Sequence, residues 1–124
     1  MEISGSDLPA LFRNACFALF DNILNLEAVE PRTQETIDLK SETLEELFLD
    51  WLRELLFRFT TQYFAVKEVN RIALSGTHLK AELKGERFDP ARHRVKIEIK
   101  TPTYHMFRIE QGPDGCRARI IFDV

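Results

Sequence analysis

The sequence contains little cysteine and no long uninterrupted hydrophobic run. Its 124 residues include two cysteines, Cys16 and Cys116, and no Cys-x-x-Cys pair. Such sparse and widely separated thiols are typical of a reducing compartment, so we expect a cytoplasmic protein. The most hydrophobic stretch, LFLDWLRELLFRF at 47–59, is broken by four charged residues, which excludes a membrane-spanning helix. No basic segment followed by an apolar run opens the chain, so we expect no signal peptide.

Positive charge is also in short supply. The chain has 17 Lys and Arg residues against 20 Asp and Glu residues, and its net charge is −3. The isoelectric point is about 5.6. Proteins that hold nucleic acid by bulk electrostatics need a surplus of positive charge, so the composition disfavours that class of function.

Recognisable catalytic motifs are absent as well. The sequence has no Gly-rich phosphate-binding loop between a predicted strand and a helix, no GxSxG and no HExxH. The three histidines, His78, His93 and His105, lack the close spacing of zinc ligands, so we interpret each as a surface or turn residue. A self-sufficient enzyme is therefore not the favoured interpretation.

Two segments have the periodicity of amphipathic helices. The first spans 7–24, with Ser6 as the predicted N-cap. The second follows a capping box made by Thr43 and Glu46. Its apolar stripe consists of Leu44, Leu47, Phe48, Trp51, Leu52, Leu55, Leu56 and Phe59.

The second helix also carries a predicted ion pair on its polar side. Glu54 and Arg58 lie outside the apolar stripe and four residues apart, which places their side chains next to each other on a helix. We expect this pair to contribute a few tenths of a kcal/mol, as is typical of such spacing.

After Thr61 the hydrophobic pattern changes to the two-residue period of β-strands. Strands are predicted at 64–74, 78–84, 95–101, 103–110 and 116–124, with an earlier one at 32–40 and the end of another at 1–4. Pro-Asp-Gly in QGPDG predicts a tight turn, so the last two strands should form a hairpin. This order predicts a single α+β domain over 1–124, with a mostly antiparallel sheet and two amphipathic helices packed on one face.

The final stretch, RARIIFDV at 117–124, raises the question of what Asp123 does. Alternation places Arg117, Arg119, Ile121 and Asp123 on one strand face and Ala118, Ile120, Phe122 and Val124 on the other, which should be the core face. Three interpretations of Asp123 stay open: a solubilising edge charge, an ion-pair partner for an arginine, or a ligand for Ca²⁺ or Mg²⁺. A metal site would need at least one more acid converging from elsewhere.

Glu30 is a candidate for that additional acid. It precedes Pro31, which favours an extended conformation, in the loop after the first helix. Loops on a rigid scaffold often carry function. The default interpretation of the same residue is an ordinary solvated loop acid.

Several short stretches in a fixed order give the sequence a family resemblance. They are VEP at 29–31, LEELFLDWLRELLFRF at 44–59, GERFDPARH at 85–93, IKTPTYH at 99–105, DG at 114–115 and the final IFDV. Each stretch is weak evidence alone. Together, in this order and along the whole chain, they make the sequence resemble the archease family.

The resemblance implies an accessory protein and not an enzyme. Archeases act with RtcB-type tRNA-splicing ligases and promote their GTP-dependent guanylylation and multiple turnover. We therefore expect an RtcB-type RNA ligase as the partner, with tRNA and GTP met only through the ligase, and no membrane. The alternatives are a chaperone-like modulator of RNA-modifying enzymes and a stand-alone metal-dependent nucleotide enzyme.

The resemblance also implies a bound divalent cation, calcium in the first place, with magnesium and manganese as alternatives. Matched to this sequence, the ligands are Asp123 and Val124, and Glu30 is an essential acid near the metal. The family's remaining ligand is an acid in an HTAD-like strand that would precede Met1, so this chain is expected to lack the family's first N-terminal strand. The missing neighbour would leave a sheet edge through which a homo-oligomer could form.

Overall fold

The structure is a computed structural model that describes the backbone of residues 2–89, 101–103 and 108–123, and the side chains of residues 2–89 and 108–120. In chain order its elements are β1 (Glu2–Gly5), α1 (Leu8–Ile23), the 3-10 turn η1 (Leu26–Ala28), β2 (Thr33–Lys40), α2 (Leu44–Gln62), β3 (Phe64–Ser75), β4 (His78–Arg87), β5 (Thr101–Thr103), β6 (Ile109–Gly112), β7 (Gly115–Arg119) and β8 (Ile121–Asp123).

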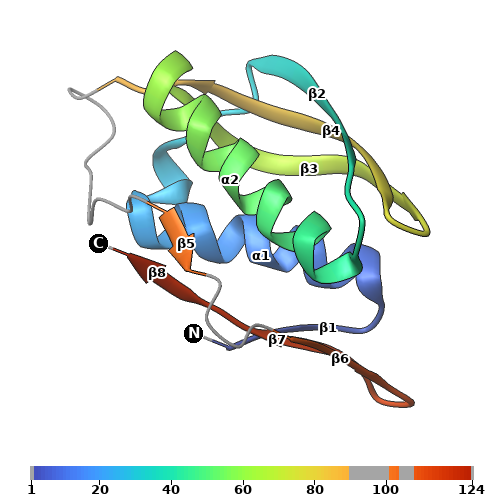
Figure 1. The fold of residues 1–124 in the computed structure, drawn as a ribbon. Helices are drawn as coiled ribbons and strands as arrows, with labels where there is room; N and C mark the ends of the chain where they lie inside the picture. The colour runs from blue at the N-terminus through green and yellow to red at the C-terminus, as the bar shows by residue number, and fades with distance from the viewer. Residues whose placement is uncertain (1, 90–100, 104–107, 124) are drawn as a thin grey trace.

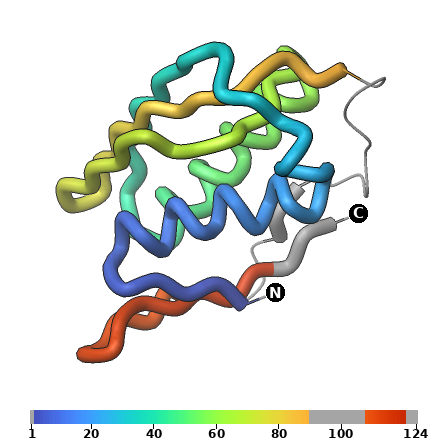
Figure 2. The backbone as a smooth tube through the Cα atoms, turned by 180° about the vertical axis from the view of Figure 1, so that it is seen from behind, coloured from blue at the N-terminus to red at the C-terminus, as the bar shows by residue number. Residues whose placement is uncertain are grey.

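The described strands form three antiparallel sheets, with the orders β2-β4-β3, β1-β7-β6 and β5-β8. Both helices pack against the β2-β4-β3 sheet, and α1 also contacts β1 and β7. In Figure 1 the helices lie between this sheet above and β1, β7 and β6 below, and Figure 2 shows α1 from behind in the same position. The predicted α+β class is confirmed. The strands divide among separate sheets, and α1 is covered by β3 on one side and by β1 and β7 on the other (Figure 1).

Local sequence signals located the start of each helix to within one residue. α1 is capped by Asp7 and not by Ser6, because the Asp7 Oδ1 atom accepts a hydrogen bond from the Ala10 N–H at 2.9 Å. Both residue types are good N-caps, so the sequence alone did not separate them. α2 begins as predicted, where Thr43 Oγ1 accepts from the Glu46 N–H at 3.1 Å.

The predicted C-terminal hairpin is confirmed as β6 and β7, which pair up to Gly112 and Gly115 around the turn. Gly115 has a φ of 122°, and a Cβ atom there would lie 2.5 Å from the Gly5 carbonyl oxygen. Only glycine combines this backbone angle with so close an approach to β1.

The predicted last strand, 116–124, is interrupted at Ile120. β7 ends at Arg119 in pairing with β1, whereas β8 begins at Ile121 and pairs with β5. The change of partner strand breaks the single predicted strand into two. The predicted strands at 95–101 and 103–110 fall largely outside the described residues, within which their ends contribute to β5 and β6.

The hydrophobic core lies between the helices and the two larger sheets. Trp51 is fully buried, and its Nε1–H donates to the Phe12 carbonyl oxygen at 2.8 Å, which joins α2 to α1. Phe12 also meets Phe48 edge to face, with ring centroids 5.0 Å apart. Cys16 is buried in this core, and burial raises the pKa of its thiol far above the usual range, so it stays protonated and unreactive. No helix within the described ranges has the length and hydrophobicity to cross a membrane.

Candidate functional site

The segment between α1 and β2 is anchored before it reaches Glu30. Asn25 caps η1 through its side-chain oxygen. The Leu26 carbonyl oxygen accepts hydrogen bonds from the Val29 N–H at 3.1 Å and from Lys67 Nζ of β3 at 2.8 Å. Val29 is buried in the core. The backbone entering Glu30 is therefore fixed by both the turn and the sheet.

The segment is anchored again immediately after Glu30. The Arg32 N–H donates to the Gly85 carbonyl oxygen at 2.9 Å, which joins the start of β2 to β4. At Gly85 a Cβ atom would lie 1.9 Å from the Ala65 carbonyl oxygen, so glycine alone allows β4 to approach β3 this closely. The next residue on this tightly packed strand is Glu86.

Glu86 is the single charged residue that is buried among the side chains described, with 5% of its surface exposed. Its Oε2 atom accepts a hydrogen bond from the Glu30 N–H at 2.5 Å. Its Oε1 atom lies 3.8 Å from Arg32 Nε. The Glu86 carboxylate therefore fixes the Glu30 backbone by a hydrogen bond and also lies next to the Arg32 side chain.

The Glu30 carboxylate is paired with Arg32. Arg32 Nε donates to Glu30 Oε2 at 2.7 Å, and the Arg32 NH2 nitrogen lies 2.5 Å from the same oxygen. Both side chains are more than half exposed, at 55% for Glu30 and 60% for Arg32. The site is thus one guanidinium between an exposed and a buried carboxylate, with a formal charge of one negative unit. We call these three residues the Glu30–Arg32–Glu86 cluster.

Neither Arg32 nor Glu86 was identified from the sequence. Arg32 follows Glu30 by two residues, a spacing that in an extended segment places two side chains on the same side and could have predicted the pair. In the structure the two residues also meet across a tight turn at Pro31, where the Arg32 N–H donates to the Glu30 carbonyl oxygen at 3.0 Å.

Glu86 gave no such signal, because the predicted strand ended at residue 84. The strand in fact continues to Arg87, and alternation along it would place Glu86 on the polar face with Lys84 and Glu82. In the structure the chain entering β2 lies against Glu86, through the Glu30 N–H and the Arg32 side chain.

The structure confirms the predicted faces of the last strand where its side chains are described. Ala118 and Ile120 are buried, and Arg117 and Arg119 are exposed. Each arginine pairs with the acid directly opposite it on a neighbouring strand. Arg117 lies 3.3 Å from Glu110, and Arg119 lies 3.5 Å from Glu2.

Asp123 and Val124 are only partly within the described chain. The Asp123 backbone lies in β8 opposite Thr101, whereas its side chain and the whole of Val124 fall outside the description. In Figure 1 the end of β8 and the segment after α1 lie toward the same side of the molecule. The three interpretations of Asp123 stay open, and its role as a cation ligand stays a prediction.

The cluster fits a hard cation in donor chemistry but does not complete a coordination shell. Ca²⁺ takes six to eight oxygen ligands, and carboxylates are the usual protein contribution. Within the described parts of the chain, no three His, Cys, Asp or Glu side chains are grouped closely enough to hold a metal ion. Glu30 offers one exposed carboxylate on a rigid backbone, which at present binds a guanidinium.

Of the three histidines, only His78 lies within the described residues. His78 Nε2 lies 2.6 Å from Asp38 Oδ1 on the neighbouring strand β2, so it forms a surface pair, in agreement with its prediction as a surface residue. The hydrogen bond from His78, followed by the charge of His78 and of nearby lysines, holds the pKa of Asp38 below its usual value. His93 and His105 lie outside the described residues.

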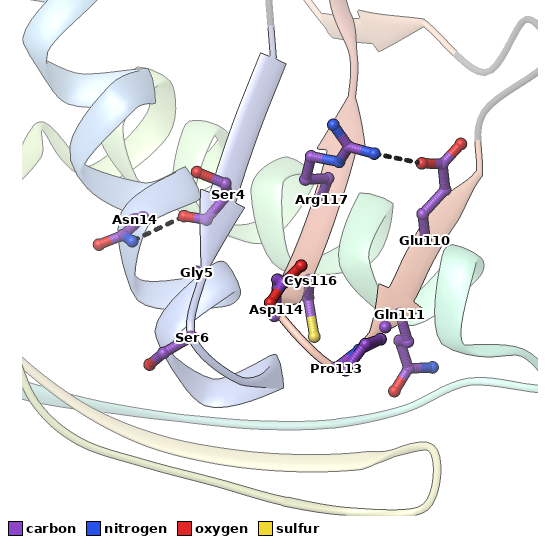
Figure 3. A pocket seen from close by; sticks show the side chains of 12 residues that line it. Ser4, Gly5, Ser6, Asn14, Glu110, Gln111, Pro113, Asp114, Cys116 and Arg117 are labelled. Atoms are coloured by element: carbon purple, nitrogen blue, oxygen red, sulfur yellow. Dashed lines mark hydrogen bonds and ion pairs between the residues drawn. The ribbon is translucent and has the colours of Figure 1, made fainter.

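A hollow of about 780 Å³ lies between the start of α1 and the β6–β7 hairpin. Figure 3 shows its lining, where Arg117 and Glu110 point toward each other across the two strands. Asn14 donates to the Ser4 carbonyl oxygen at 2.8 Å. The main opposite charges of the hollow thus pair with each other, and in Figure 1 the hairpin lies on the other side of the molecule from the segment after α1.

Comparison with known proteins identifies similar sequences over the whole chain. The model of the Archease protein family (MTH1598/TM1083) matches residues 1–124. Protein archease of Archaeoglobus fulgidus is 34% identical over 125 residues, which cover 99% of this chain and 90% of that protein. Protein archease of Methanosarcina acetivorans is also 34% identical over 125 residues, with 97% and 85% covered.

Solved structures of similar fold match the chain over its whole length as well. The solution structure of Methanobacterium thermoautotrophicum protein 1598 superimposes with a TM-score of 0.82 at 29% identity, covering 99% of this chain and 89% of that one. The crystal structure from Thermotoga maritima described as an archease, possible chaperone, gives a TM-score of 0.69 at 22% identity, with 100% and 88% covered. The second likeness shows the shared fold.

Proposed function

This chain belongs to the archease family, and on that basis we propose that it is a cytoplasmic accessory protein that activates an RtcB-type RNA ligase in tRNA splicing. It promotes the GTP-dependent guanylylation of the ligase and lets the ligase act repeatedly, meeting tRNA and GTP through the ligase. The observation that carries this proposal is the family match over residues 1–124. The net charge of −3 supports a protein partner more than bare RNA.

We further propose that Asp123, Val124 and Glu30 hold a divalent cation, calcium in the first place, with magnesium or manganese as alternatives. Glu30 suits this role because its backbone is fixed on both sides and its carboxylate is half exposed. A bound cation would supply positive charge for phosphate oxygens in the ligase's nucleotide site. The residues of this chain orient that charge and present it at the surface.

The test is ligation by the cognate ligase at limiting concentration, with wild-type protein, Asp123→Ala or Glu30→Gln added. We expect wild-type protein to support many products per ligase, and both variants to leave the ligase near a single turnover. Glu110→Gln is the matched control, since it removes an exposed carboxylate from the hairpin. Unchanged multiple turnover with Asp123→Ala would remove Asp123 from the mechanism.

Two measurements separate this proposal from its alternatives. The pure protein should not turn over GTP or RNA with a 2′,3′-cyclic phosphate when the ligase is absent, whereas activity there would favour the stand-alone enzyme. Affinity purification of the tagged protein from its own cells should recover the RtcB-type ligase. Recovery of a different RNA-modifying enzyme in place of the ligase would favour the chaperone-like modulator.

A further inference from the structure

The geometry of the cluster points to a regulatory role for its arginine. We propose that Arg32 is an internal competitor for the cation at Glu30, and that Glu86 accepts the Arg32 guanidinium when a cation takes its place. This inference rests on the proposed cation site and adds the two residues that set its affinity. It concerns how the chain itself controls access to Glu30.

The guanidinium already occupies the position that a cation would need. Two Arg32 nitrogens lie 2.5 and 2.7 Å from a single oxygen, Glu30 Oε2. A divalent ion bound to that carboxylate would stand within a few ångströms of the arginine charge. Like charges at this separation repel, so the two cations cannot share Glu30 on equal terms.

Glu86 provides a second place for the same guanidinium. Arg32 Nε is 3.8 Å from Glu86 Oε1, so a movement of about 1 Å converts this contact into a charge-assisted hydrogen bond of ordinary length. The Glu86 carboxylate is buried and fixed on β4, whereas the Arg32 side chain is 60% exposed and long. The arginine can therefore move while its second partner stays in place.

The backbone does not need to follow. The Arg32 N–H is held by the Gly85 carbonyl oxygen at 2.9 Å, and the Glu30 N–H is held by Glu86. Neither contact involves the Arg32 side chain, so both should remain when that side chain moves or is replaced by glutamine. Replacement of Arg32 thus tests its charge without removing the contacts that position Glu30.

The experiment is calorimetric titration of the purified protein with CaCl₂ at constant ionic strength. Arg32→Gln should bind Ca²⁺ about fivefold more tightly than wild type, because it removes one charge at a few ångströms from a partly solvated site. Arg32→Lys should stay close to wild type, since the competing charge is kept. The matched control is Arg71→Gln, an 82% exposed arginine paired with Glu82 on β3 and β4, which should leave affinity unchanged.

A double-mutant cycle tests the part played by Glu86. Glu86→Gln keeps an oxygen that can accept from the Glu30 N–H but removes the charge that would receive Arg32. Glu86→Gln should weaken Ca²⁺ binding more in the wild-type background than in Arg32→Gln, because Arg32→Gln has no guanidinium for residue 86 to bind. Equal weakening in both backgrounds would overturn the transfer to Glu86, because it would show only a structural or long-range charge effect.

The outcomes also separate this inference from the proposed function. Equal or weaker affinity of Arg32→Gln, with Asp123→Asn abolishing binding, would overturn competition at Glu30 and leave the Asp123 site standing. If neither the wild-type protein nor any variant binds Ca²⁺, Mn²⁺ or Mg²⁺, both the cation site and its control by Arg32 are overturned. Ligase activation without any cation binding would leave the accessory role intact and this inference wrong.

Discussion

At the scale of single residues, Glu86 helps to fix the position of Glu30. Burial of a carboxylate costs folding free energy unless the carboxylate is paired and hydrogen-bonded. The Glu86 carboxylate accepts a hydrogen bond from the Glu30 N–H and lies next to the Arg32 guanidinium. The two partners come from the segment that enters β2, so the carboxylate fastens that segment to β4. The position of the exposed acid, Glu30, therefore depends in part on its hydrogen bond to the buried acid, Glu86.

Glu86→Ala should therefore destabilise the fold by about 2 kcal/mol, because the Glu30 N–H loses its acceptor and Arg32 loses one carboxylate. Urea denaturation followed by circular dichroism measures the change. Glu82→Ala removes a partly exposed glutamate from the same strand and should cost no more than about 0.5 kcal/mol. Similar losses for the two variants would contradict the anchoring role of Glu86.

Asp38 makes a pH-dependent contribution at the surface. Its pKa lies below the usual value of 3.8, first through the hydrogen bond from His78 and then through the nearby positive charges. Because the pKa is lower in the folded than in the unfolded state, the stabilisation is present above the usual value and is lost as pH falls through the lowered one. An NMR titration of the Asp38 carboxyl should show its pKa rising toward the usual value in His78→Gln. An unchanged midpoint would show that His78 is not the cause.

At the scale of elements, Arg58 joins α2 to β2. Its guanidinium contacts Glu54 at 2.9 Å within the helix, Glu35 at 2.6 Å on β2, and the Thr36 carbonyl oxygen at 3.1 Å. The predicted Glu54–Arg58 pair is thus confirmed and extends across two elements. Partial burial of the guanidinium opposes its charge, but these hydrogen bonds outweigh that effect and raise the pKa of Arg58 above its usual value.

Arg58→Met should lower the free energy of unfolding by about 2 kcal/mol, since it removes several charge-assisted hydrogen bonds while keeping the aliphatic stem. Arg58→Lys should recover only part of the loss, because an ammonium group lacks the planar fork that reaches three acceptors. On the same helix, Arg53→Met breaks an exposed pair 3.4 Å long and should change stability by less than about 0.5 kcal/mol. Equal effects at the two positions would argue against the link to β2.

At the scale of the whole molecule, the charge disfavours direct binding of nucleic acid. The net charge is −3, and the outer face of the β2-β4-β3 sheet mixes both signs, with Glu82 and Arg71 as one pair across it. Neither feature provides the surplus of positive charge that tracks a phosphate backbone. This distribution is compatible with the proposed contact with tRNA through the ligase and does not by itself identify that partner.

The isolated protein should accordingly show no retention of tRNA in a filter-binding assay at physiological salt, with any Kd weaker than about 10 μM. Retention should appear only when the cognate ligase is added. Tight, salt-sensitive binding by the protein alone would contradict the indirect contact. An assay at low salt serves as the internal control, since electrostatic binding to RNA strengthens there.

The sequence by itself determined the features that depend on neighbours within a few residues. Helical periodicity and the Thr43 cap placed α2, Pro-Asp-Gly placed the β6–β7 turn, and two-residue alternation assigned Ala118 and Ile120 to the core. These signals are local because backbone hydrogen bonds and turn geometry involve residues close along the chain. The α+β class followed from the order of such segments.

Only the tertiary structure decided how the strands divide among sheets and what surrounds Glu30. The Glu30 N–H meets a carboxylate 56 residues away, and no local pattern distinguishes Glu86 from Glu82, the other acid of the same strand, which is partly exposed. Burial of a charged side chain depends on which distant segment covers it, which is a property of packing. The loop position of Glu30 could be predicted from the chain, whereas its pairing with Arg32 next to a buried acid required the fold.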